Sequence, residues 1–389
     1  MTLVILMLSI PVREFCQEAP RDFHFGSSGQ TSVALTDQSV IEVSINGKGP
    51  FKVFFDTGAN VSILDPEIVA QLNLPASNIV GPVTGLSGGT IDTKPFHVKE
   101  LRIGELTLND QDFFNIPIPL PKSYAIVGAI GFDLFSRMAI KADYERHRLI
   151  LIDPARFSYT GSGQKLDLQP DPQSIVVKMR IDNKAGDCLL DTGALGEPEL
   201  GLNGWFVRRN RLVRRFARHY QGVFSKGADG NAPRATVERM RAVCLGGACM
   251  SGVIAELSEG NEKNAYAGRV GVGILQRFTT TIDWQHHVLY MEKTPTWDRP
   301  AVYNVTGLET DLAEAGDALI VSKVFPDSPA SRAHLEVGDR ILSIDNHPPA
   351  PDWFSDDPDF LKPQGTRVIL TVQRGSAKRQ VALILKEIL

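Results

Sequence analysis

Two aspartates of this 389-residue chain stand in the same four-residue sequence. Asp56-Thr57-Gly58-Ala59 and Asp191-Thr192-Gly193-Ala194 each follow an apolar run. At average residue usage, a chosen four-residue string is expected by chance in roughly one chain of this length in a hundred. Two copies therefore favour an internal repeat, in which two carboxyl groups occupy equivalent places.

An aspartate that follows an apolar strand and precedes Thr-Gly is expected on a tight turn. Glycine permits close backbone approach, and the threonine hydroxyl can bond to nearby backbone. If the two turns meet, the carboxyl groups of Asp56 and Asp191 become neighbours that hold one proton between them. One then acts as base towards a water and the other as acid towards a carbonyl. This chemistry hydrolyses an amide without a metal or a covalent intermediate.

Further landmarks follow each tetrapeptide in the same order. Each copy continues with a glycine turn, an apolar-Gly segment, an Asp-aromatic pair and a closing apolar strand. With the first copy given before the second, the four landmarks are residues 101–106 and 243–248, 130–138 and 270–278, 143–144 and 283–284, and 149–151 and 288–290. The shared order supports duplication of a whole domain.

Alternation of apolar and β-branched residues with turn residues divides the chain. We expect two β-rich lobes, one over residues 31–153 and one over 174–293. The polar, Gly- and Pro-containing segment 154–173 between them is predicted to be a linker. Residues 1–30 precede the first lobe, and residues 301–389 form a third unit.

Composition excludes few classes of function. The formal net charge of -4 gives no reason to expect a nucleic acid partner. The apolar run near the start is too short to span a membrane, and no integral membrane segment is expected. It is similar to the apolar region of an export signal, so we expect export to a bacterial periplasm or medium. If it is no signal, the protein is expected to be cytoplasmic.

The four cysteines are too few to determine the fold. Cys244 and Cys249 flank Gly246-Gly247, a two-residue turn signal that predicts a hairpin. Such a hairpin sets the two thiols opposite each other, where a disulfide and two reduced cysteines are equally compatible with the sequence. No spacing of Cys or His indicates a zinc site, and neither a metal nor another cofactor is predicted.

Two other motifs are typical of different functions, a serine hydrolase and a nucleic acid or membrane binder. Gly85-Leu-Ser87-Gly-Gly89 matches the G-x-S-x-G of α/β-hydrolases, but the residues after it give no helix start. A trypsin-like triad needs a histidine in the same domain, and His24 is the only one upstream of Ser87. The segment 205–220 predicts a basic helix, packed on its lobe and solvated by its arginines. Binding of nucleic acid or an anionic membrane by that helix is the less favoured interpretation.

The residues around both tetrapeptides resemble the retroviral-type and bacterial aspartyl proteases. The resemblance implies that Asp56 and Asp191 are catalytic. It also implies that an apolar-Gly segment passes beneath each aspartate turn. It covers roughly residues 32–293 and rests on residues 54–64 and 130–134 in the first copy, and on 190–194 and 270–271 in the second.

That family covers its site with a glycine-rich flap, a role that the resemblance gives to Gly85, Ser87, Gly88 and Gly89. In the second copy, residues 225–230 occupy the corresponding interval, as a flap or as an ordinary loop. The second copy also departs from the family pattern. Ser62 stands six residues after the first aspartate, whereas Glu197 stands six residues after the second. The geometry around Asp191 is therefore less certain from sequence than that around Asp56.

The C-terminal unit resembles a PDZ domain over about residues 303–389. The resemblance rests on a strand leading to Ser-Pro-Ala at 328–330 and on Gly338-Asp339 before the next strand. PDZ domains add a peptide strand to a sheet edge and hold its terminal carboxylate in backbone amides. This implies that Thr306, Gly307 and Leu308 form the peptide-binding loop. PDZ domains also serve as packing modules, so both roles are open.

The sequence predicts a mainly β protein. It comprises two retropepsin-like acid-protease β-barrel lobes, paired as a pseudo-dimer, and a C-terminal α+β PDZ domain. The predicted function is an aspartic endopeptidase whose PDZ domain recruits or regulates protein and peptide substrates. The alternative is a noncatalytic peptide-binding scaffold with degenerate lobes. A third variant keeps catalysis but pairs like lobes from two chains.

Overall fold

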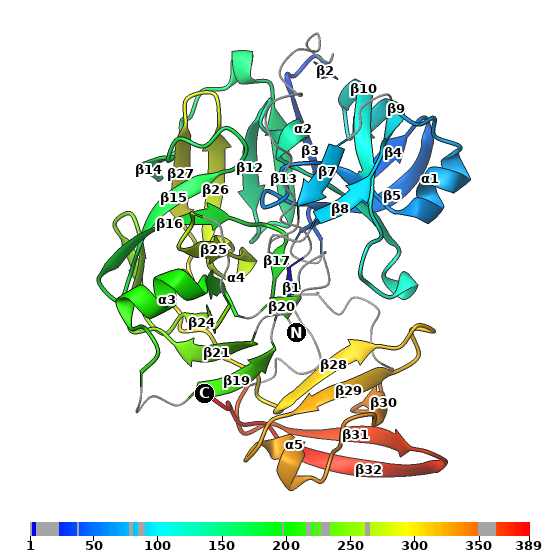
Figure 1. Cartoon of the computed structure of the whole chain (residues 1–389), viewed down its shortest axis with the longest axis vertical. Helices are drawn as coiled ribbons and strands as arrows, with labels where there is room; N and C mark the ends of the chain where they lie inside the picture. Colours follow the sequence, from blue (N-terminus) through cyan, green and yellow to red (C-terminus); the bar gives the residue numbers. More distant parts are fainter. Residues whose placement is uncertain are drawn as a thin grey trace. The chain divides into compact units, whose positions relative to one another are not determined.

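The computed structural model is mainly β, as predicted (Figure 1). Residues 2–119 and 126–300 form one compact unit, and residues 301–389 with 120–125 form a second. The structure describes residues 2–4, 23–36, 39–77, 81–84, 90–196, 198–214, 219–223, 225–226, 234–260, 265–348 and 363–389.

The first lobe is built on a hairpin that delivers Asp56 to the interior. β4 (Val40–Ile45) and β5 (Lys48–Phe55) are joined by Asn46-Gly47, whose φ angles of 50° and 73° suit a tight hairpin turn. β5 ends in buried Phe54 and Phe55, immediately before Asp56. β9 pairs with both β4 and β10, which closes the sheet. The first lobe also contains β2 (Phe23–His24), β6 (Ile63–Leu64), α1 (Pro66–Leu72), β7 (Gly81–Thr84), β8 (Thr90–Thr93), β9 (Pro95–Ile103), β10 (Leu106–Asn115) and β11 (Ile126–Ile130).

The second lobe repeats this hairpin. β15 (Val176–Ile181) and β16 (Lys184–Leu190) are joined by Asp182-Asn183, with φ angles of 43° and 67°. β16 ends in buried Leu189 and Leu190, immediately before Asp191. The same local pattern therefore delivers both aspartates. The lobe also contains β17 (Ala194–Leu195), β18 (Leu200–Leu202), β19 (His219–Val223), β20 (Ser225–Lys226), β21 (Arg234–Arg239), β24 (Ile254–Ser258) and β25 (Gly268–Val270).

The predicted landmarks fall on equivalent elements in both lobes. The segments 130–138 and 270–278 each leave a strand and form a short helix after glycine, α2 (Phe132–Phe135) and α4 (Val272–Leu275). Each helix then leads to a hairpin, β12 (Ala139–Asp143) with β13 (Arg148–Ile152) and β26 (Phe278–Asp283) with β27 (Val288–Lys293). The duplication inferred from sequence is therefore a duplication of structure.

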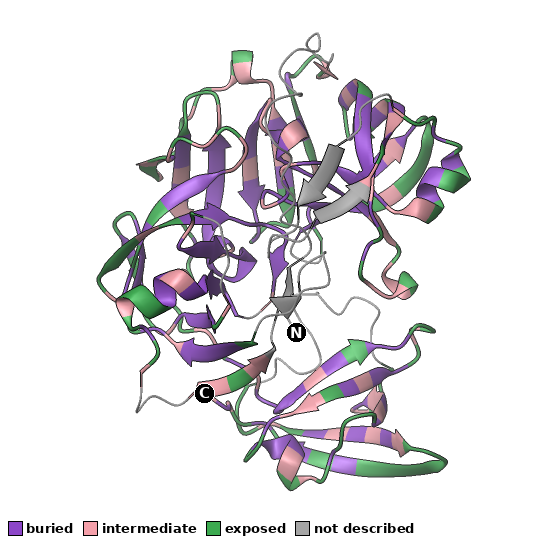
Figure 2. Cartoon of the chain, in the orientation of Figure 1, coloured by how far each residue is buried: buried purple, intermediate pink, exposed green. Residues whose placement is uncertain are grey.

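A six-stranded sheet joins the two lobes. Its order is β14-β27-β26-β12-β13-β3, where β3 is Gln30–Ala34 and β14 is Gln164–Asp167. β12 and β26, equivalent strands of the two lobes, pair antiparallel at its centre. β14 comes from the predicted linker and pairs with β27, so that segment also extends the sheet. The sheet makes the two lobes one continuous structure, with buried residues along its strands (Figure 2).

The second unit is a five-stranded antiparallel sheet of order β28-β29-β30-β31-β32 with one short helix. Ser328 caps α5 (Pro329–Arg332): its Oγ accepts from the N–H of Ser331, while Ser331 Oγ accepts from the N–H of Ser328. Apolar residues of all five strands form its core, and Tyr124 packs against it. The strands are β28 (Leu308–Leu312), β29 (Leu319–Val324), β30 (Arg340–Ile344), β31 (Arg367–Arg374) and β32 (Ala377–Ile384).

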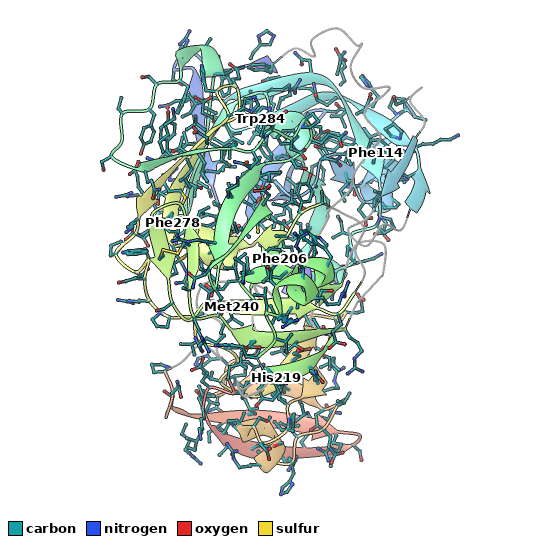
Figure 3. All side chains as sticks on the ribbon, turned by 60° about the vertical axis from the view of Figure 1, so that its left-hand side comes forward. Phe114, Phe206, His219, Met240, Phe278 and Trp284 are labelled. Carbon is teal, nitrogen blue, oxygen red and sulfur yellow. A yellow bond between two sulfur atoms is a disulfide. The ribbon has the colours of Figure 1, made fainter. Side chains whose placement is uncertain are left out.

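The basic helix predicted over 205–220 is wrong at residues 211–214 and 219–220, while residues 215–218 lie outside the described part of the chain. The helix α3 (Gly204–Asn210) ends where Arg211 adopts a left-handed conformation, with φ 53°, and donates its N–H to the carbonyls of Val207 and Arg208. Phe206 is buried beneath this helix, and the later residues His219–Val223 pair with β21 as a strand (Figure 3). Pairing to a sheet edge therefore overrides the helical periodicity of the sequence.

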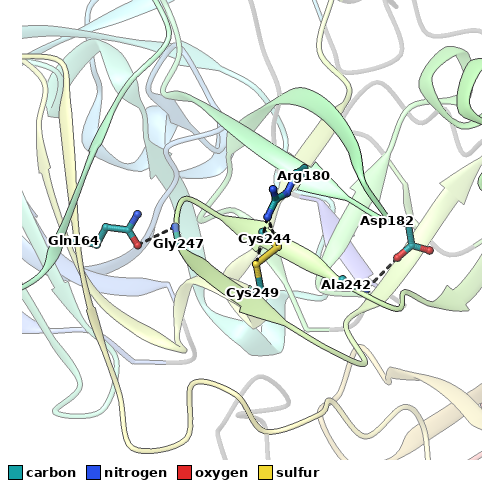
Figure 4. Close-up of a disulfide and its surroundings, with 7 residues drawn as sticks. All are labelled: Gln164, Arg180, Asp182, Ala242, Cys244, Gly247 and Cys249. Carbon is teal, nitrogen blue, oxygen red and sulfur yellow. Dashed lines mark hydrogen bonds between the residues drawn. A yellow bond between two sulfur atoms is a disulfide. The ribbon is translucent and has the colours of Figure 1, made fainter.

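The hairpin predicted at Gly246-Gly247 is present, and its cysteines form a disulfide. β22 (Val243–Leu245) pairs with β23 (Ala248–Met250), and Cys244 lies opposite Cys249. Gly246 has a φ of 60°, a conformation that favours glycine. The guanidinium of Arg180 lies beside both sulfur atoms (Figure 4). No helix in the described part of the chain is long and apolar enough to cross a membrane.

Candidate active site

Each aspartate turn rests on the apolar-Gly strand of its own lobe, as the family resemblance implies. β5 pairs in parallel with β11, and the N–H of Asp56 donates to the carbonyl of Ile130 over 3.0 Å. In the second lobe β16 pairs with β25, and the N–H of Asp191 donates to the carbonyl of Val270 over 3.0 Å. The two turns are therefore held at the same height in their lobes.

The two threonines lock the turns to each other. Thr57 Oγ1 donates to the carbonyl of Leu190 over 2.7 Å, and Thr192 Oγ1 donates to the carbonyl of Phe55 over 2.6 Å. Thr57 Oγ1 also accepts from the N–H of Thr192 over 3.1 Å, and Thr192 Oγ1 accepts from the N–H of Thr57 over 2.9 Å. Both threonines are buried. Four reciprocal hydrogen bonds thus join the turns within a single chain.

The carboxyl groups meet over the glycines of the opposite turns. A Cβ added to Gly58 would lie 2.4 Å from Asp191 Oδ1, and one added to Gly193 would lie 2.4 Å from Asp56 Oδ2. Only glycine leaves room for this arrangement. Ala59 and Ala194, which complete the tetrapeptides, are both buried.

One oxygen of each carboxyl group is bonded within its own turn. Asp56 Oδ1 accepts from the N–H groups of Gly58 and Ala59 over 2.9 and 3.1 Å, and Asp191 Oδ1 accepts from Gly193 over 3.0 Å. Both Oδ2 atoms are buried and have no hydrogen-bond partner among the residues that the structure describes. A buried acceptor without a partner needs a physical explanation, and a catalytic role is one such explanation.

Burial and proximity change the protonation of both groups. Burial raises the pKa of Asp56 well above its usual range, and the charge of Asp191 raises it further. Burial also raises the pKa of Asp191, to about 6, although Arg269 and the N–H groups of its turn act in the opposite direction. The pair therefore retains a proton at a pH where exposed aspartates are ionised, as a shared-proton dyad requires.

The loop that follows Asp191 is longer than the loop that follows Asp56. Glu197 is therefore not the structural equivalent of Ser62, although both stand six residues after their aspartates. Gly131 packs on the carbonyl of Val61, and its equivalent Gly271 packs on that of Glu199. Val61 stands five positions after Asp56, and Glu199 stands eight positions after Asp191, so the second loop is three residues longer. Glu197 itself lies outside the described residues. Glu199 is buried and forms an ion pair with Arg277 over 2.6 Å, which anchors the longer loop.

The predicted flap of the first lobe is a hairpin. β7 and β8 pair antiparallel, with Thr84 opposite Thr90 next to the turn. The predicted flap residues Gly85, Ser87, Gly88 and Gly89 lie outside the described residues, so their role stays a prediction. In the second lobe, the interval proposed for a flap contributes the strand Ser225–Lys226.

A short strand from the start of the chain lies beside the second aspartate turn. β1 (Thr2–Val4) pairs antiparallel with β17, with Val4 opposite Ala194, and in parallel with β20. Along β1 the chain runs from a position opposite Leu195 to one opposite Ala194, which is towards the second Asp-Thr-Gly turn. An extended peptide is therefore accommodated between the active-site loop and β20.

Sequence reasoning missed a buried ion pair between two strands of the second lobe. Arg269 lies on β25, immediately before Val270, and its Nη2 is 3.3 Å from Glu256 Oε2. The exposed fractions of the two side chains are 10% and 4%. The signal was available, since the gap-free alignment places Arg269 opposite Ala129 and an arginine in an otherwise apolar strand is unusual.

The predicted peptide-binding loop of the second unit is buried and bonded internally. The N–H of Gly307 donates to Asn304 Oδ1 over 2.7 Å, and the N–H of Leu308 donates to Thr306 Oγ1 over 3.1 Å. The carboxylate of a bound peptide would have to replace Asn304 Oδ1 and Thr306 Oγ1 as the acceptor of these two N–H groups. β28, which follows the loop, is an edge strand with one side unpaired in the sheet order. Its role in peptide binding stays a prediction.

Comparison with protein-family models identifies two domains. A model described as aspartyl protease matches residues 41–134, and a PDZ domain model matches residues 320–374. The chain therefore contains an aspartyl protease domain and a PDZ domain. The first match ends before the second tetrapeptide, so the place of Asp191 rests on the geometry above. A search of curated proteins finds no match to this chain.

Among the side chains that the structure describes, no group of three or more His, Cys, Asp or Glu residues is arranged to hold a metal ion.

The threonine bonds predict a specific stability pattern. Thr192→Val removes the hydroxyl, which leaves the N–H of Thr57 buried without its acceptor. It also removes one of the two donors to the carbonyl of Phe55, to which Ser39 Oγ still donates. We expect a loss of about 1.5–4.5 kcal/mol in the free energy of unfolding, because an unpaired buried group costs about 1–3 kcal/mol and a net hydrogen bond contributes about 0.5–1.5 kcal/mol. Thr192→Ser keeps the hydroxyl and should lose less than about 1 kcal/mol, within the range of one net hydrogen bond. Equal stability of the two variants in urea unfolding would contradict this account.

The raised pKa values predict a pH-dependent gain in stability from Asp56→Asn. A carboxyl group whose pKa is raised on folding contributes stability that is present below its unfolded pKa, near 4, and lost as pH rises through the folded pKa. The variant should therefore gain about 1–3 kcal/mol over the wild type at pH 7 and much less at pH 4, at about 1.4 kcal/mol per pKa unit. Urea unfolding at both pH values measures this, with exposed Asp311→Asn as control. A difference that is independent of pH would be incompatible with a raised pKa.

Proposed function

We propose that this protein is an aspartic endopeptidase in which Asp56 and Asp191 share one proton and activate a water. The observation that carries the proposal is the meeting of two buried carboxyl groups over each other's glycines, with both Oδ2 atoms unbonded among the described residues. The reciprocal threonine bonds support it, because they hold this geometry before any substrate binds. Preorganisation of this kind is what lowers a reaction barrier.

The proposed reaction needs only these two side chains and water. The ionised carboxyl group takes a proton from water as the water oxygen attacks the peptide carbonyl carbon. The protonated carboxyl group gives its proton to the carbonyl oxygen, which forms a neutral gem-diol. When the C–N bond breaks, the first group returns its proton to the leaving nitrogen, and the second recovers one from a hydroxyl. The dyad ends in the state in which it began.

Peptide substrates are proposed to bind as extended strands. The pairing of β1 with β17 and β20 supports this, because backbone hydrogen bonds to an edge strand recognise a peptide with little regard to its sequence. The β7–β8 hairpin is proposed to cover the substrate from the first lobe. The PDZ domain is proposed to recruit protein substrates by adding a peptide terminus to the β28 edge.

We also propose that the protein works in an oxidising compartment, as its sequence led us to expect. The disulfide between Cys244 and Cys249 supports this, since such bonds persist chiefly in exported proteins.

Cleavage of an unfolded protein across pH tests the proposed function. Asp56→Asn and Asp191→Asn should each lower kcat/KM at least about 100-fold, the usual contribution of a general acid or base. Asp187→Asn changes an exposed carboxyl group in the middle of β16, the strand that leads to Asp191, and should leave activity unchanged. Loss in Asp56→Asn alone would make the second lobe structural. Absence of cleavage by the folded wild type at every pH would favour the noncatalytic scaffold.

Where the start of the chain is retained and not removed as an export signal, the position of β1 predicts that it competes with substrate. A variant lacking residues 1–22 should have a lower KM for a peptide substrate than the full chain, because β17 and β20 no longer pair with β1. Its kcat should change little, since the dyad is unaltered. As a matched control, a peptide of residues 1–22 is added to the shortened protein. This should restore the higher KM of the full chain. An unchanged KM in the shortened protein would exclude competition.

A further inference from the structure

The disulfide of the second lobe lies at the edge of its sheet. The nine-stranded sheet ends in the order β15-β22-β23, so β23 has a neighbour on one side only among the strands that the structure describes. Cys249 is the middle residue of β23 and is exposed, whereas Cys244, opposite it on β22, is buried. One cysteine of the pair therefore faces solvent and the other is largely covered.

The hairpin that carries the bond is held by other contacts. The N–H of Gly247 in its turn donates to Gln164 Oε1 of β14 over 3.1 Å (Figure 4). The two cysteines are only five positions apart, and a disulfide that closes a short loop removes less freedom from the unfolded chain than one that closes a long loop. The other residues of both strands are apolar and buried, namely Val243, Leu245, Ala248 and Met250. Packing and the turn therefore hold the hairpin independently of the bond.

A positive charge lies beside the bond. Arg180 stands on β15 opposite Cys244, and Cys244 stands opposite Cys249, so the three residues form one row across three strands. Arg180 Nη2 is 3.5 Å from Cys244 Sγ and 3.7 Å from Cys249 Sγ (Figure 4). A neutral disulfide gains little from a cation, whereas a thiolate accepts a charge-assisted hydrogen bond from it. The guanidinium therefore favours the product of bond cleavage over the intact bond.

We propose that the Cys244–Cys249 bond is a thiol-exchange site, at which a low-molecular-weight thiol attacks Cys249 and Arg180 stabilises the thiolate that leaves from Cys244. The thiolate of the incoming molecule forms a bond to Cys249 Sγ as the bond between the two cysteines breaks. The electron pair of the broken bond goes to Cys244 Sγ, which then takes up the proton that the incoming thiol lost. One thiol and one disulfide thus give one mixed disulfide and one thiol, and no other oxidant or reductant takes part.

The same geometry makes the exchange reversible. Cys244 stays opposite Cys249, so its thiolate attacks Cys249 again, expels the small thiol and restores the original bond. A small group is therefore attached to the exposed edge strand only while thiols are abundant. In the oxidising compartment proposed above, the bond re-forms when they are removed. Neither step involves the aspartate dyad.

Mixed-disulfide formation in the full, folded chain tests the site. The oxidised protein is incubated with 2-mercaptoethanol, free thiols are blocked by rapid addition of N-ethylmaleimide, and the first product is mapped by peptide mass spectrometry. We expect 2-mercaptoethanol on Cys249 and N-ethylmaleimide on Cys244. A first product with 2-mercaptoethanol on Cys244, or a bond that resists the thiol until urea unfolds the protein, would overturn the proposal.

The rate of the same reaction tests the role of Arg180. Arg180→Met should lower the second-order rate constant at least about threefold, because the pKa of the leaving thiol controls the rate and an adjacent cation moves a pKa by about one unit or more. Arg180→Lys keeps a positive charge and should restore most of the rate. Arg241→Met removes an exposed arginine at the start of the same hairpin and is the matched control, with an unchanged rate expected.

The sign of the change separates this role from a structural one. If Arg180 only held the hairpin in place, its loss would loosen the strands and expose the bond, which would speed exchange. An unchanged or faster rate in folded Arg180→Met would therefore overturn the role of Arg180. Peptide cleavage is not part of this measurement, so a protein that lacks the proposed protease activity would still give the same answer.

Discussion

The reciprocal hydrogen bonds of Thr57 and Thr192 are the constraint on which the rest of the site depends. Each hydroxyl bonds to the backbone of the opposite turn, so neither turn is complete without the other. These bonds fix the distance between the turns and bring each carboxyl group over the opposite glycine. Without them, two aspartates with raised pKa values would separate into water, because separation relieves both their repulsion and their desolvation.

The sheet that joins the lobes makes this arrangement intramolecular. β12 and β26 pair at its centre, so the chain supplies both halves of a structure that two identical chains would otherwise supply together. A duplicated chain is free to lose symmetry. The second lobe has done so through the longer loop that Glu199 and Arg277 anchor, and through the buried ion pair of Arg269 and Glu256.

Local sequence predicted the parts of the fold that depend on local physics. The repeated tetrapeptide gave the dyad, and Gly246-Gly247 gave a hairpin, because turn geometry is determined by a few adjacent residues. The helix expected over 205–220 ends at Asn210, since β19 pairs with β21, a contact that periodicity does not encode. Arg269 went unnoticed for a related reason: its meaning depends on Gly201 and Glu256, which are distant in sequence. The flap residues at 85–89 fall outside the described residues and stay a prediction.

Neutron diffraction from a crystal at a pH near 6 tests the central claim most directly, because it locates the hydrogen isotopes on both carboxyl groups. We expect Asp56 and Asp191 to lie together around one solvent molecule and to carry a single deuteron between them. Two ionised carboxylates, each with its own hydration and too far apart to share a water, would contradict it.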